Sequence, residues 1–159
     1  MSTNYLLSLH KRYYFPVTIL RLYLVYGPYQ DRNRVIPIVI GHALKSSEFD
    51  CSKGTQLRDF VYIDDIVRGI IKSLKNTKSI GQIINLGSGN PIKIKDIILK
   101  ICEIIGSGKP KFGKIKFRND EIKKLYPSIS KAKKILNWHP KTKINSGLKK
   151  TINYYKKYE

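Results

Sequence analysis

Cysteine, histidine and long apolar runs are scarce in this 159-residue chain, and each shortage excludes a class of protein. The two cysteines, Cys51 and Cys102, are too few and too far apart for a disulfide framework. Neither they nor the three histidines have the spacing of metal ligands. No apolar run is long enough to cross a bilayer, and residues 1–14 lack the apolar core of a secretory signal. We therefore expect a soluble, cytoplasmic protein with no metal site.

Acidic residues are also scarce, since 11 Asp and Glu face 31 Lys and Arg and leave a formal net charge of +20. Such a charge favours an anionic partner: nucleic acid, a membrane surface or a negatively charged small ligand. Most lysines of the second half stand singly or in pairs between apolar residues, as on a solvated basic surface. Basic and aromatic residues are interleaved only at residues 11–14 and 154–158. A basic nucleic-acid-binding protein therefore remains an alternative function.

Helical and strand patterns alternate along the chain, which predicts an α/β fold with more helix than strand. We expect Asp64 and Asn145 to cap two of the helices. The glycines after the third strand lack the spacing of a dinucleotide loop, so we assign them no phosphate. The pattern itself is common to many functions and identifies none of them. Helices are predicted at residues 4–14, 36–44, 64–74, 94–105, 131–136 and 145–155, and strands at residues 17–23, 59–62 and 82–86.

Arg58 is the first candidate for ligand binding, because it follows a Gly-Thr-Gln turn and precedes a short apolar strand. Its planar guanidinium suits a pyrophosphate, whose oxygens accept paired, charge-assisted hydrogen bonds. The alternative is a structural ion pair with Asp59, Asp64 or Asp65, which is the commoner fate of an arginine.

Two further basic sites accompany Arg58. Arg118 and Glu121 stand three residues apart, a cation suited to phosphate oxygens and an acceptor suited to a hydroxyl group. Arg34 precedes Ile36-Pro37 at the expected start of a helix, where a helix N-terminus already favours anions. From the sequence alone, a charged segment such as that of Arg118 is usually a solvated loop. Arg34 is equally consistent with a basic residue in the first turn of a helix, whose N-terminus binds anions without a side chain.

Two sequence blocks resemble the NAD(P)-dependent sugar-nucleotide epimerases and dehydratases, the extended short-chain dehydrogenase/reductase family. They are Arg21 to Pro28 (R-L-Y-L-V-Y-G-P) and Gly54 to Asp65 (G-T-Q-L-R-D-F-V-Y-I-D-D). Leu24 stands where that family usually has Asn. The resemblance implies that residues 1–159 form the C-terminal part of a Rossmann-like doubly wound fold plus the small substrate-binding domain, without the N-terminal dinucleotide-binding strands.

The same resemblance implies roles for individual residues. A nucleoside diphosphate sugar would be bound through its diphosphate by Arg58 with Gln56, through its phosphates by Arg118 and Arg34, and through its ribose by Glu121. Tyr23 and Val25 would lie against the nicotinamide of NAD or NADP.

No catalytic residue is assigned, because the sequence has no G-x-x-G-x-x-G loop and no Tyr-x-x-x-Lys pair. In the family that this chain resembles, both lie upstream of the Arg21 strand. We therefore expect a partial epimerase/dehydratase domain that is not catalytically competent alone and binds no dinucleotide tightly. It is expected to form a homodimer or to associate with a missing N-terminal half, because the sheet edge at residues 17–23 would otherwise be open.

Overall fold

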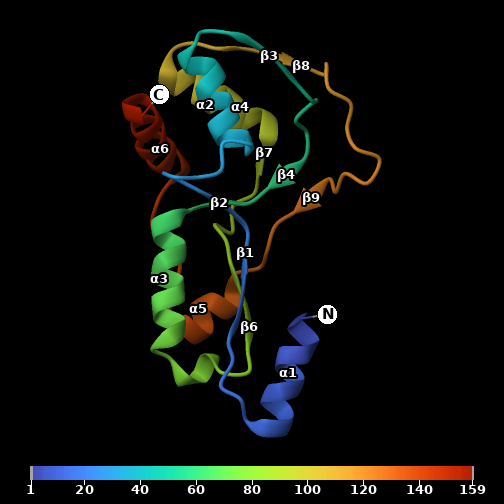
Figure 1. Cartoon of the computed structure of the whole chain (residues 1–159), viewed down its shortest axis with the longest axis vertical. Coiled ribbons are helices and arrows are strands. Elements are labelled where there is room, and N and C mark those ends of the chain that lie inside the picture. The colour runs from blue at the N-terminus through green and yellow to red at the C-terminus, as the bar shows by residue number, and fades with distance from the viewer. Residues whose placement is uncertain (1, 159) are drawn as a thin grey trace.

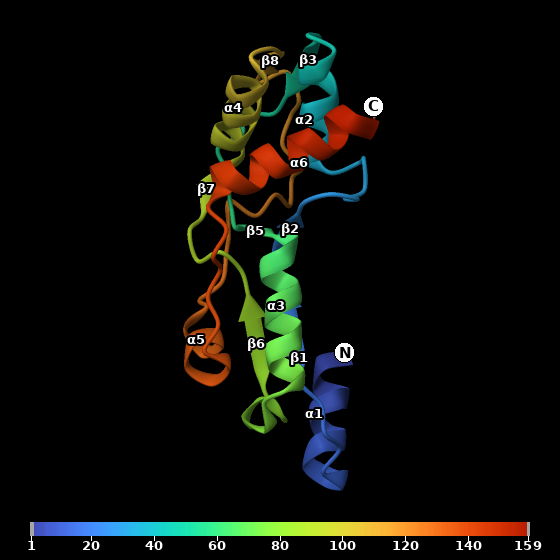
Figure 2. The same cartoon turned by 90° about the vertical axis from the view of Figure 1, so that its left-hand side faces the viewer.

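The computed structural model describes residues 2–158 as an elongated molecule with two lobes (Figures 1 and 2). Three helices dominate one lobe: α2 (Val35–Leu44), α4 (Ile94–Ile105) and α6 (Ile144–Tyr158). The other lobe contains α3 (Ile63–Leu74), α5 (Ser130–Leu136) and a pair of parallel strands, with α1 (Ser2–Tyr13) at its far end. The α/β class and the six predicted helices are confirmed.

The first predicted strand is two strands that change partner at Tyr23. Strand β1 (Ile19–Leu22) pairs in parallel with β6 (Ile83–Leu86), and β2 (Leu24–Tyr26) pairs in parallel with β5 (Phe60–Tyr62). The Tyr23 N–H still donates to the Leu86 carbonyl, whereas the next N–H donates to the Asp59 carbonyl. This switch carries the chain from one lobe to the other.

Five short strands were not predicted from the sequence. β3 (Glu48–Cys51) pairs in parallel with β8 (Lys109–Phe112). β4 (Leu57–Arg58) lies between β7 (Ile92–Lys93), which is antiparallel to it, and β9 (Lys124–Leu125), which is parallel. These strands are two to four residues long and rich in charge, so they are too short for their apolar pattern to identify a strand.

Both predicted helix caps are wrong. Asp64 lies in the first turn of α3, whose N-cap is Tyr62 without a side-chain hydrogen bond. Strand β5 runs directly into this helix, so no separate capping residue precedes it. Asn145 is likewise inside α6, one residue after its start. Gly106 does end α4 as expected, with the positive φ of 83° that glycine tolerates.

Each lobe has its own apolar core. The larger cluster joins α2, α4 and α6 around Ile40, Ile97 and Leu148. The smaller one joins β6, α3 and α5 around Ile84 and Trp138. Because β2 and β5 contribute to both clusters, they fix the lobes relative to each other.

The apolar face expected on α3 is mostly on the outside. Ile66 is buried, but Leu74 is 81% exposed, and Val67, Ile70 and Ile71 are also exposed. The buried side of the helix carries Gly69 instead, where an added Cβ would come within 2.7 Å of the Leu86 side chain. Close packing of the helix on β6 therefore turns its larger side chains away from the core.

None of the helices within residues 2–158 is long and apolar enough to span a membrane. Over the same residues, no group of three His, Cys, Asp or Glu side chains is placed to hold a metal ion.

Candidate functional site

A cavity of about 650 Å³ opens where the chain passes from β1 to β2 and approaches the start of α2. It brings together three of the predicted site residues, Tyr23, Val25 and Arg34, from segments up to eleven positions apart in the sequence. Leu125 of β9, about 90 positions later in the sequence, also lines the cavity. The full lining is Arg21, Leu22, Tyr23, Leu24, Val25, Gln30, Asp31, Arg34 and Leu125.

Arg34 lies at the N-cap of α2 in an extended conformation. Its N–H donates to the Asp31 carbonyl at 3.0 Å, while the Asp31 carboxylate accepts from the Asn33 N–H at 2.9 Å. Within residues 2–158 the Arg34 side chain is exposed and has no hydrogen bond or ion pair. A cation and the positive end of a helix thus meet at the cavity, which suits an anionic group.

Gln30 is a lining residue that sequence analysis missed. Its side-chain amide donates to the Val25 carbonyl at 2.8 Å, and its own backbone carbonyl accepts the Tyr155 hydroxyl at 2.8 Å. Its Oε1 atom is buried and has no hydrogen-bond partner among the described residues. A buried acceptor without a partner is costly, so a ligand N–H or O–H would be stabilised there.

Arg58 and Glu121, both predicted site residues, form an ion pair. The Arg58 side chain is only 12% exposed, and it divides its donors between the Leu57 carbonyl and the Glu121 carboxylate. In the register of β4 and β9, Arg58 stands opposite Leu125, which lines the cavity. Arg58 therefore lies on a strand whose neighbour, β9, contributes to the cavity lining, and Glu121 lies three residues before β9.

The three ion pairs considered for Arg58 from the sequence are not found. Asp59 accepts the N–H groups of Ser88 and Gly89, and Asp65 pairs with Arg68. In the segment after β6, the N–H groups of Ser88 and Gly89 therefore already have an acceptor.

Gln56 and Arg118 flank the ion pair. Gln56 lies two residues before Arg58, and its buried Oε1 has no partner among residues 2–158. The Arg118 carbonyl accepts the Glu121 N–H at 3.1 Å, which closes a turn ahead of β9. In the described part of the chain, the exposed Arg118 side chain makes no hydrogen bond or ion pair. Neither residue lines the 650 Å³ cavity.

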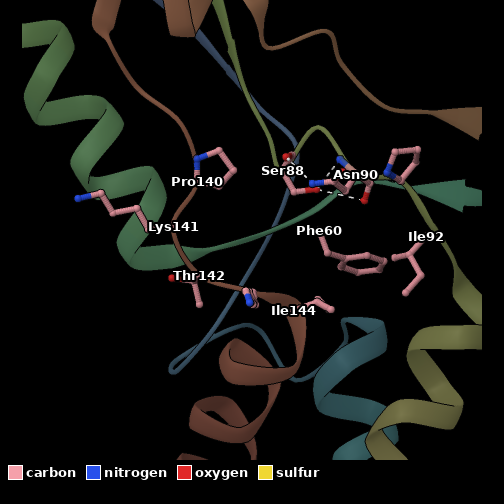
Figure 3. Close-up of a pocket in the computed structure, with 10 residues that line it drawn as sticks. Phe60, Ser88, Asn90, Ile92, Pro140, Lys141, Thr142 and Ile144 are labelled. Atoms are coloured by element: carbon pink, nitrogen blue, oxygen red, sulfur yellow. Dashed lines mark hydrogen bonds between the residues drawn. The ribbon is translucent and has the colours of Figure 1, made fainter.

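A second cavity of about 440 Å³ contains none of the predicted residues (Figure 3). Phe60 and Ile92 lie side by side along it, while the Lys141 side chain points away toward α3. Like the first cavity this one has a mostly apolar lining, but none of the predicted basic residues borders it. Its lining is Phe60, Ser88, Asn90, Pro91, Ile92, Pro140, Lys141, Thr142, Lys143 and Ile144.

Comparison with known proteins gives a consistent set of relatives. The model of the NAD dependent epimerase/dehydratase family matches residues 1–87. A UDP-glucuronate 4-epimerase of Thermodesulfobacterium geofontis is 41% identical over 149 residues, which are 92% of this chain and 45% of that protein. The dTDP-glucose 4,6-dehydratase 1 of Escherichia coli is 28% identical over 163 residues, covering 97% of this chain and 45% of the relative.

Solved structures agree with the sequence relatives. The UDP-glucose 4-epimerase of Thermotoga maritima with UDP-glucose superimposes with a TM-score of 0.92 at 29% identity, covering 99% of this chain and 51% of that one. The UDP-glucuronic acid 4-epimerase of Bacillus cereus, in complex with UDP-glucuronic acid and NAD, gives a TM-score of 0.88 at 34% identity, covering 98% and 50%. The chain thus spans about half the length of the relatives that it matches. None of these relatives is described as a nucleic-acid-binding protein.

Proposed function

This chain belongs to the NAD-dependent epimerase/dehydratase family, and on that premise we propose that it supplies the nucleotide-sugar-binding part of such an enzyme. The observation that carries the proposal is the position of Arg58. It is a largely buried cation on a strand whose partner strand lines the 650 Å³ cavity. A buried guanidinium beside a cavity is suited to a diphosphate, since it is desolvated and presents a fork of donors.

The remaining predicted residues take supporting roles in this proposal. Arg34 and Arg118, whose side chains have no internal partner in residues 2–158, would meet further phosphate oxygens. Gln56 would use its unpaired Oε1 next to Arg58. Glu121 would accept a ribose hydroxyl once it leaves Arg58.

The cofactor of the proposed enzyme is NAD or NADP, which supplies the hydride acceptor. Tyr23 and Val25 line the cavity, and the buried Gln30 Oε1 offers an acceptor that fits an amide N–H of such a group. The 159 residues contain no Tyr-x-x-x-Lys pair and no glycine-rich dinucleotide loop. We propose that proton transfer and tight dinucleotide binding need groups outside these residues, so that this chain alone has no catalytic activity.

The first test is nucleotide binding by an Arg58→Gln variant. We expect wild-type protein to bind UDP-glucose in calorimetry and the variant to bind roughly 10- to 100-fold more weakly, because a charge-assisted contact is lost. Arg12→Gln is the matched control, since it removes the same charge from an exposed position of α1. Equal affinities for the two variants would contradict the proposal, as would a wild-type protein that binds no nucleotide sugar.

A second proposal concerns the partner. Among residues 2–158, β1 pairs only with β6, so its other edge is open. Helix α3, several of whose apolar side chains are exposed, lies in the same lobe (Figure 2). An open edge beside exposed apolar side chains favours association, and we propose that a second copy or the remaining half of the enzyme covers this surface.

The association predicts a concentration-dependent oligomer for the isolated chain. The double variant Ile71→Lys, Leu74→Lys should weaken self-association at least about tenfold in sedimentation velocity, because each buried side chain contributes roughly 1.5 to 3 kcal/mol. Ile115→Lys, which also replaces an exposed isoleucine, should leave it unchanged. A wild-type chain that stays monomeric at all concentrations would refute the self-association.

A further inference from the structure

The ion pair between Arg58 and Glu121 occupies the guanidinium that the proposed function assigns to a diphosphate. The Glu121 side chain is 26% exposed and that of Arg58 is 12% exposed, so the arginine is the more deeply buried partner. One Arg58 nitrogen donates to the Leu57 carbonyl and another to Glu121. Any phosphate that approaches Arg58 therefore meets a site whose charge is already neutralised.

The pairing is selective within its surroundings. The segment around Glu121 is rich in exposed cations, yet the carboxylate contacts the arginine of a neighbouring strand. The turn that joins the Glu121 N–H to the Arg118 carbonyl fixes the backbone, and β9 begins three residues later. Asp120, its neighbour, is exposed and pairs with no cation in residues 2–158. The exposed cations are Lys114, Lys116, Arg118, Lys123 and Lys124.

We propose that Glu121 is a specificity-determining residue, an internal carboxylate that a ligand must displace from Arg58. This inference rests on the proposed function. Exchanging a carboxylate for a single phosphate at Arg58 gives little net gain, because one anion replaces another. A diphosphate brings a second phosphoryl group, which a free guanidinium such as that of Arg118 or Arg34 can bind. Glu121 thus rejects monophosphates and admits diphosphates.

After a ligand displaces it from Arg58, the Glu121 carboxylate still has partners for its charge. Its side chain already reaches solvent, so the released carboxylate can be hydrated or can accept a ligand hydroxyl. The cost of opening the pair is therefore moderate, whereas a fully buried carboxylate would prevent binding altogether.

The test uses inorganic pyrophosphate and inorganic phosphate as probes, so that no ribose contact enters the measurement. The Glu121→Gln variant keeps the shape of the side chain and one acceptor oxygen, but its side chain is uncharged. We expect this variant to bind pyrophosphate at least about tenfold more tightly than wild type in calorimetry. Phosphate, which wild type rejects, should bind measurably. Asp120→Asn removes the same charge one residue away and should change either affinity by less than about twofold.

A double variant shows whether the gain acts through Arg58. In an Arg58→Gln background, Glu121→Gln should give no gain, because there is no guanidinium to release. The inference is overturned when Glu121→Gln leaves pyrophosphate affinity unchanged, when the gain persists without Arg58, or when Asp120→Asn reproduces it. Glu121→Asp shortens the side chain by one methylene and should also raise the affinity for pyrophosphate. This variant replaces Glu121→Gln in the test if the glutamine variant does not fold.

Failure of this inference differs from failure of the proposed function. If wild type and the Arg58→Gln variant bind pyrophosphate with equal affinity, Arg58 is not the diphosphate ligand and the proposed function is refuted. A protein that depends on Arg58 but gains nothing from Glu121→Gln refutes only the internal competition.

Discussion

Replacing Asp65 by Asn is expected to lower the free energy of unfolding by about 3 to 5 kcal/mol, since it removes the charge from a buried, fully paired carboxylate. The Asp65 side chain is completely buried. Its oxygens accept the N–H groups of Lys141 and Thr142, each at 3.0 Å, and pair with Arg68. An asparagine would turn an NH₂ group toward one of these donors and leave it without an acceptor.

The same carboxylate joins distant parts of the chain. It lies at the start of α3, whereas its two backbone donors come from the segment between α5 and α6. The Trp138 ring nitrogen donates to the Asp65 carbonyl at 2.9 Å and reinforces the contact. Asp65 therefore fixes the connection that leads from the smaller core cluster to α6.

The Asp65 contribution should depend on pH. Burial raises the pKa of this carboxyl group, but the N–H groups of Lys141 and Thr142 and the Arg68 guanidinium outweigh it and hold the pKa below its ordinary value. A carboxyl group with a lowered pKa in the folded state stabilises the fold fully above its unfolded pKa. The contribution is lost as the pH falls through the folded value, so the difference between wild type and variant should narrow below about pH 4.

Urea unfolding at pH 7 and at acidic pH measures both effects. Asp64→Asn is the matched control, because Asp64 is the exposed neighbour in the same helical turn and should cost less than about 1 kcal/mol. Equal losses for the two variants at pH 7 would show that Asp65 acts only through the helix dipole.

The elements that could be predicted from the sequence are those with a sustained apolar period. The isoleucines of α4 recur at helical spacing, and the structure buries Ile97, Ile98 and Ile101 in the larger core. Strands β3 and β8 do alternate between exposed and more buried residues, but each is only four residues long, which is too short for the pattern to identify a strand. Their pairing is decided by how α2 and α4 pack, which is a tertiary effect and not a local one.

For α3 the sequence predicts the helix but not which of its sides is buried. Its period correctly predicts a helix, but periodicity cannot say which neighbour covers the apolar side. The glycine at position 69 permits close contact with Leu86 and so decides which side is buried. The larger side chains are then left exposed.

The sequence proposed candidate site residues but could not predict their contacts. The motif around Arg58 located that arginine, yet the sequence pointed to nearby aspartates as structural partners, whereas the structure pairs it with Glu121, 63 positions away. Gln30 could not be found, because a buried amide oxygen without a partner exists only in three dimensions. Motifs identify the groups, and packing decides which are free to bind.

Replacing Gly147 by Ala should destabilise the protein by roughly 2 to 3 kcal/mol, although alanine favours a helix by about 1 kcal/mol over glycine. Gly147 lies in α6, and an added Cβ would stand 2.1 Å from the hydroxyl oxygen of Tyr26. Tyr26 is buried and packs edge-on against Phe60 and Tyr62, so its ring has no free space into which to move. The overlap must therefore be relieved by displacing α6 from the core.

The direction of the stability change distinguishes this clash from helix propensity, because propensity alone would make an alanine variant more stable. Asn153→Ala, at an exposed position of the same helix, should be neutral or slightly stabilising in thermal unfolding. Tyr26→Phe removes the oxygen but leaves the ring carbon 2.9 Å from the added Cβ, so it should recover only part of the loss, about 1 kcal/mol. If the Gly147→Ala variant is as stable as wild type, the Tyr26 side chain can move to make room for the added methyl group. The contact between Tyr26 and Gly147 would then not fix the position of α6 relative to β2.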